Sequence, residues 1–101
     1  MNDIQQTCQL IRKDFHLTDD EFVQIQDRAA LKAALSRVIH YLLDHDMSRL
    51  LQALYRIDVA ESSVKHILAY ADSDAMAGEL ADLVVNRQLQ KVITRNKYRS
   101  S

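Results

Sequence analysis

Hydrophobic side chains recur at helical spacing along the whole chain. Near the N-terminus, four of them fall at i, i+4, i+7 and i+11, the positions of one helical face: Ile4, Cys8, Ile11 and Phe15. This pattern predicts a first helix over residues 2–14.

A second set of hydrophobic positions follows: Phe22, Ile25, Ala29, Leu31, Leu35, Val38, Ile39 and Leu42. Thr18 and Glu21 stand at the spacing of a capping box, so we expect a helix to begin there and to reach about Asp44. The phase of the set drifts near Asp27. Residues 18–44 therefore form either one long helix or two helices with a break at Asp27.

Two shorter helices are expected next. Asp46 can cap a third helix, whose predicted inward-facing residues are Leu50, Leu51, Leu54 and Tyr55. A fourth helix can start at Asp58 or Glu61, and its predicted buried residues are Val64, Ile67, Leu68 and Ala71.

The last helix should be capped within residues 72–74 and should run to about Arg95, leaving residues 96–101 as a basic, frayed tail. Connections this short make neighbouring helices pack on each other. We therefore predict an all-α fold, a compact bundle of about five helices with a long C-terminal helix, as a single domain over residues 1–95.

Composition supports the helical prediction. Proline is absent and Gly78 is the only glycine among 101 residues, whereas a sheet with tight hairpins needs more residues with positive φ. Cys8 is the only cysteine, which excludes an internal disulfide and favours a small buried residue in a reducing compartment. No apolar run approaches the length of a membrane span, so we expect no membrane partner.

The segment HYLLDHD, residues 40–46, gathers two histidines and two aspartates. Only His40 and Asp44 have the i, i+4 spacing that would let both bind one ion from a helix. Two ligands are too few for a structural zinc site. We interpret the segment as the solvated end of a helix followed by the cap of the next, with Asp46 as that cap, and expect no metal.

No pattern in the sequence predicts catalysis. One glycine cannot form a glycine-rich phosphate loop, and no serine or cysteine stands in a nucleophile motif. We expect neither catalytic residues nor a cofactor.

The run LLQALYRIDVAESSVKHIL resembles the bihelical unit of helix-turn-helix proteins, and residues 49–70 would form it. The predicted inward residues are Ile57, Val59, Val64 and Ile67, and the candidates for nucleic-acid contact are Ser62, Ser63, Lys65 and His66. Asp58 occupies the position in the turn where glycine is usual, and Leu54 the place of a small residue. DNA binding is therefore the alternative function, and two consecutive core helices explain the same pattern.

Charge is unevenly distributed. Residues 1–86 carry 8 basic and 14 acidic side chains, whereas residues 87–101 carry five basic side chains and no acidic one. This basic end can satisfy the helix dipole, contact the acidic body, or bind a nucleic acid or an acidic protein surface.

The last helix carries two opposed hydrophobic stripes. At about 100° per residue, the early stripe should face the core: Met76, Leu80, Leu83 and Val84. The late stripe lies nearly opposite: Val85, Leu89 and Val92, with Gly78 in line for a close backbone approach. Because one core buries one face, the late stripe needs another helix of the chain, such as the first, or a second subunit.

The segments LLQALYRIDVAES and ELADLVVNRQLQKVITR, within residues 47–95, resemble a group of short, all-helical bacterial proteins without assigned activity. That resemblance implies a cytoplasmic bacterial protein and carries over no site residues. We expect a non-catalytic interaction module that binds itself, as a homodimer, or another protein. Its predicted partner-binding residues are Val85, Leu89, Val92 and Ile93, rimmed by Arg87 and Lys91.

Overall fold

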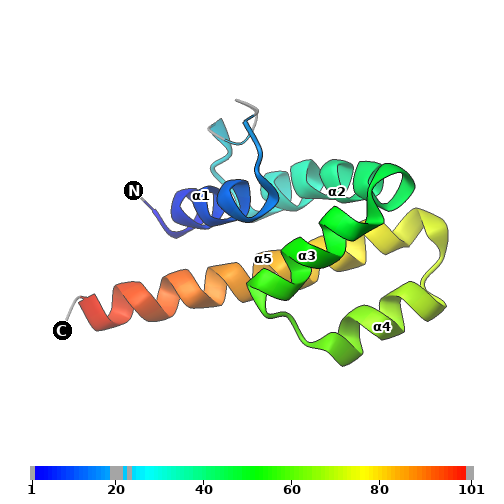
Figure 1. Ribbon diagram of the computed structural model, residues 1–101. Helices are drawn as coiled ribbons and strands as arrows, with labels where there is room; N and C mark the ends of the chain where they lie inside the picture. The colour runs from blue at the N-terminus through cyan, green and yellow to red at the C-terminus, as the bar shows by residue number, and fades with distance from the viewer. Residues whose placement is uncertain (1, 19–21, 23, 100–101) are drawn as a thin grey trace.

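The chain folds as an all-α bundle with a long last helix, as predicted (Figure 1). The computed structural model describes residues 2–18, 22 and 24–99, and these contain five helices and no strand. In chain order the helices are α1 (Asp3–Phe15), α2 (Arg28–His45), α3 (Met47–Ile57), α4 (Glu61–Tyr70) and α5 (Ser73–Arg99).

Polar caps fix the ends of the first two helices. The Asn2 side chain accepts a hydrogen bond from the backbone N–H of Gln5 at 2.8 Å, while the Gln5 side chain accepts one from the backbone N–H of Asn2 at 3.1 Å. The α1 helix ends at His16, which adopts a left-handed conformation with φ of 55°. Asp27 caps α2 by accepting from the Ala30 N–H at 2.8 Å.

The break at Asp27 is therefore confirmed. The helix predicted to begin at Thr18 is wrong, because the described residues between Thr18 and Asp27 contain no α-helix. The predicted capping box cannot be assessed, because Glu21 lies outside the described residues. Phe22 and Ile25 are nevertheless buried, as the pattern required.

The boundaries of α3 follow from two aspartates. Asp46 accepts a hydrogen bond from the Arg49 N–H at 3.1 Å and starts the helix, as predicted. Asp58 ends it in the left-handed region, with φ of 65°, a conformation that aspartate tolerates better than most residues. Asp58 is thus the end of α3, and of the two predicted starts for α4, Glu61 is the observed one.

Helix α5 forms the spine of the bundle, because it contacts each of the other four helices. Leu80 and Val84 of its early stripe are fully buried, and Met76 and Leu83 pack against the core at its edge. That part of the helix was predicted correctly.

The end of α5 differs from the prediction. The helix continues to Arg99, so residues 96–99 are helical rather than frayed. Asn96 donates a hydrogen bond from Nδ2 to Oδ1 of Asp3 at 2.7 Å, which ties this end to the start of α1. The start of α1 and the end of α5 accordingly lie on the same side of the bundle (Figure 1).

Candidate functional site

The late stripe of α5, predicted as the partner-binding surface, lies largely inside the chain. Val85 and Val92 are 0% and 1% exposed, Leu89 is half-buried, and only Ile93 presents substantial surface, at 47%. A homodimer contact through Val85 and Val92 is therefore wrong, because neither side chain has surface to offer. Packing within the chain, the alternative explanation, is confirmed for these two residues.

Two different helices cover this stripe. Near Val85, α5 is held to α2 by Asp82, whose carboxylate binds Lys32 Nζ at 2.9 Å, and by Asn86, which accepts from Arg28. Near Val92, α5 is held to α1 by Gln88, which donates to Asp14, and by the Asn96–Asp3 hydrogen bond. The sequence left cover by another helix and cover by a second subunit both open, and the chain itself covers the stripe because α5 is the central helix of the bundle.

The cations predicted to rim that surface bind the end of α3 instead. Lys91 donates from Nζ to the backbone carbonyl of Ile57 at 2.8 Å, and Arg87 Nη2 lies 3.7 Å from Oδ2 of Asp58. The last carbonyls of a helix carry its negative dipole end, which cations stabilise.

In the segment that resembles a helix-turn-helix, the residues predicted to point inward are buried and most of those predicted to contact a nucleic acid are exposed. Ile57, Val64 and Ile67 are buried and Val59 partly so. Among the candidates for nucleic-acid contact, Ser62, Lys65 and His66 are exposed and Ser63 is half-buried.

The bihelical unit itself is not formed. Both helices are described in full, and no Cα atom of α3 lies within 8 Å of one in α4, whereas α4 packs on α5. Lys65 is also engaged by Glu61, at 3.1 Å between Nζ and Oε1. The inward residues of α4 are buried because α4 packs on α5. The pattern that resembled a helix-turn-helix is therefore explained by two consecutive core helices, the alternative given above.

Between α3 and α4 lies a hollow of about 430 Å³, here called the α3–α4 groove. Its lining comes from both helices and their connection: Leu51, Leu54, Tyr55, Asp58, Val59, Ala60, Glu61 and Val64. Leu51 is 44% exposed and Tyr55 is 88% exposed. The groove therefore has a mostly apolar lining, with the carboxylates of Asp58 and Glu61 at one end and two large, solvent-exposed side chains, Leu51 and Tyr55, along α3.

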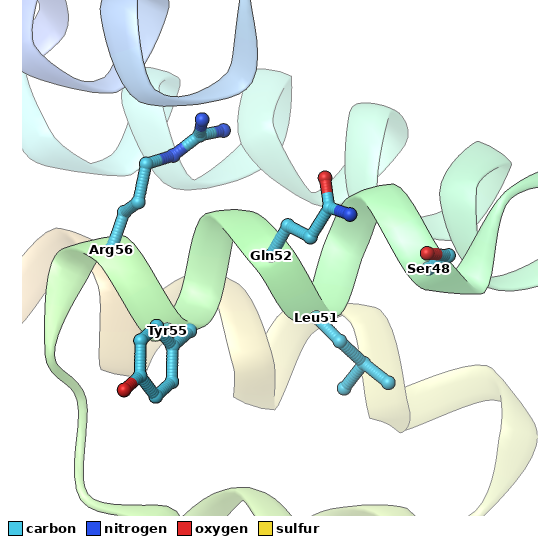
Figure 2. A pocket seen from close by; sticks show the side chains of 5 residues that line it. All are labelled: Ser48, Leu51, Gln52, Tyr55 and Arg56. Carbon is cyan, nitrogen blue, oxygen red and sulfur yellow. The ribbon is translucent and has the colours of Figure 1, made fainter.

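A second hollow, of about 660 Å³, adjoins the groove along α3 and shares Leu51 and Tyr55 with it (Figure 2). In Figure 2, Leu51 and Tyr55 project from one side of α3, and Gln52 and Arg56 from the other. Arg56 is anchored there, since its Nη2 donates to the Asp14 carbonyl at 2.8 Å. Leu51 and Tyr55 thus form a ridge between the two hollows.

This surface was missed because Leu51 and Tyr55 were predicted to face inward, which is wrong. The buried face of α3 consists of Leu50, Ala53, Leu54 and Ile57. Those positions follow the i, i+3, i+4, i+7 rule, and the signal was overlooked because Ala53 was not counted among the core residues.

The HYLLDHD segment ends α2 in solvent, as interpreted. His40 Nε2 lies 3.7 Å from Oδ2 of Asp44, and both side chains are mostly exposed. His45 stacks on Tyr41, with ring centroids 4.3 Å apart. Among the described residues, no three His, Cys, Asp or Glu side chains come together as a metal ion would need.

The Cys8 thiol is a poor nucleophile. Burial raises its pKa above the ordinary value, and this outweighs the nearby Arg12, which lowers it. Because the thiolate is the reactive form, Cys8 behaves as a small core residue.

Comparisons with protein-family models, with curated proteins and with solved structures found no match to this chain. Within the described part of the chain, no helix has both the length and the apolar character needed to cross a membrane.

Proposed function

We propose that this protein is a non-catalytic protein-interaction module that binds a helical segment of a partner protein in the α3–α4 groove. The observation that carries the proposal is the exposure of Leu51 and Tyr55 beside an apolar hollow. Exposed apolar side chains next to such a hollow are typical of protein contact sites, and tyrosine is enriched among the residues that dominate binding energy.

The geometry fits one recognition mode best. An amphipathic helix binds by laying its apolar face between two helices that present a hydrophobic floor. Here Leu54 and Val64, both nearly buried, supply that floor from α3 and α4. Neither a dimer through the late stripe of α5 nor a helix-turn-helix is proposed, since the first is covered and the second is not assembled.

Site-specific photo-crosslinking in cells that naturally make the protein tests this function. With p-benzoylphenylalanine at position 55, we expect discrete covalent adducts to a partner polypeptide. The matched control is position 41, another exposed tyrosine, which lies on α2 outside the groove.

Adding Leu51→Asp to the crosslinkable chain should abolish the adducts. It should lower the free energy of unfolding by only about 1 kcal/mol, because Leu51 is already 44% exposed and the change loses part of its burial and some helix propensity. Equal adduct yields from positions 55 and 41, or adducts indifferent to Leu51→Asp, would contradict the proposal.

A further inference from the structure

A basic hollow of about 300 Å³ lies on α5, close to the α3–α4 groove. Its lining consists only of cationic and neutral polar side chains: Arg87, Gln90, Lys91, Thr94 and Arg95. The three cations follow one another at intervals of four residues, which is about 6 Å per step along a helix. At about 100° per residue, they share one face within about 80°.

The basic hollow and the groove meet at the end of α3. Asp58 lines the groove, and its carboxylate lies 3.7 Å from Arg87, which lines the basic hollow. Lys91 donates to the Ile57 carbonyl, one residue before Asp58. A single continuous segment of a partner can therefore contact the α3–α4 groove and the basic hollow at the same time.

We infer that the partner is an acidic amphipathic helix, whose apolar residues fill the groove and whose carboxylates bind Arg87, Lys91 and Arg95. This inference rests on the proposed function and names the chemistry of its partner. An ammonium carries three donors and a guanidinium five, so Lys91 and Arg87 can bind a carboxylate while keeping their contacts to α3.

The charges of the groove also set the direction of the segment. Asp58 and Glu61 line the end of the groove where the chain passes from α3 to α4, and both side chains are more than 80% exposed. These two carboxylates would repel acidic residues of a segment bound in the α3–α4 groove. The acidic residues of the partner must therefore lie in the basic hollow on α5, at one end of the segment whose apolar residues fill the groove.

The test uses the full chain and a phage-displayed library of random peptides about 15 residues long, or roughly four helical turns. Peptides selected on the wild-type protein should combine apolar residues at helical spacing with at least two Asp or Glu at one end. Their affinities are then measured by fluorescence anisotropy against matched variants.

Arg95→Glu should weaken the selected peptides at least about tenfold, because a charge-assisted contact becomes a repulsion. Lys97→Glu is the control, since Lys97 is exposed on the same turn of α5 and does not line the basic hollow. Lys97→Glu should change the affinity less than about threefold. Added salt should weaken peptide binding to the wild type more than it weakens binding to Arg95→Glu, because screening acts on the charged contact that the variant lacks.

The outcomes separate the two proposals. If no selected peptide loses binding on Tyr55→Asp, the groove function itself fails. If peptides depend on Tyr55 but respond equally to Arg95→Glu and Lys97→Glu, or if neutral and basic sequences are enriched, the acidic partner is overturned and the groove function stands. Binding of a single-stranded oligonucleotide that depends on Arg95 but not on Tyr55 would also overturn it, in favour of a nucleic acid.

Discussion

Two adjacent side chains on α5, Val92 and Ile93, show how steeply the environment changes from one position to the next. Val92 is 1% exposed and lies between Gln88 and Asn96, which both bond to α1, whereas Ile93 keeps nearly half of its surface in water. Removing methyl groups from a buried position loses transfer free energy and leaves a cavity, while an exposed position loses little.

Val92→Ala should therefore lower the free energy of unfolding by about 2 kcal/mol. Ile93→Ala should lower it by only about 1 kcal/mol, although it removes more atoms, because nearly half of the Ile93 surface is already in water. Urea denaturation of the two variants beside the wild type measures both values. Equal losses at the two positions would mean that α1 does not cover Val92.

At the scale of the helices, Gly78 lies inside α5, where glycine is costly. The sequence suggested that it permits a close backbone approach, and that interpretation is wrong. A Cβ atom built at this position meets only the flexible Lys32 side chain, whose Cε would lie 3.9 Å away, an ordinary van der Waals distance.

Gly78→Ala should accordingly raise the free energy of unfolding by about 0.5–1 kcal/mol, through helix propensity and a less flexible unfolded chain. The melting temperature followed by circular dichroism would rise with it. A lower melting temperature would indicate that the backbones of α2 and α5 approach more closely than they do here.

Local signals predicted the helices well, because caps and periodicity act within a few residues. Asp46 and Asp27 mark real helix starts, and the buried stripes of α1 and α4 follow from their spacing alone. Which helix meets which depends on contacts between residues far apart in the chain. The cover over Val92 comes from α1, so the sequence could show a second apolar stripe but not its occupant.

The candidate site was hidden for a related reason. Leu51 and Tyr55 look like core residues in a one-dimensional pattern, and only the divergence of α3 and α4 leaves them exposed. The sequence did show the basic end of α5, because residues 87–101 carry five basic side chains and no acidic one. Its role depends on where α3 ends, because Arg87 and Lys91 contact that end.

At the scale of the whole molecule, α1 packs on the C-terminal half of α5. Its removal should uncover Val92 and the remaining surface of Leu89, which then present the apolar stripe that a second subunit could cover. A chain lacking residues 1–16 should bind a hydrophobic dye several-fold more strongly and associate, as measured by light scattering.

A synthetic peptide of residues 1–16 supplied in trans should reverse both effects. Residues 1–16 contain all of α1 and its C-terminal cap, so the peptide offers the same contacts. A truncated chain that stays monomeric and binds no dye would indicate that α1 contributes little cover.

The antiparallel contact between α1 and the end of α5 also bears on how the protein is made. Asp3 and Asp14 meet Asn96 and Gln88, so α1 leaves the ribosome before these partners, which are encoded more than seventy residues later. At cellular rates of translation, that delay is about 4–15 seconds. During this interval, the apolar face of α1 formed by Ile4, Cys8 and Ile11 lacks the contacts that α1 makes with α5, and we expect nascent-chain chaperones to bind it there.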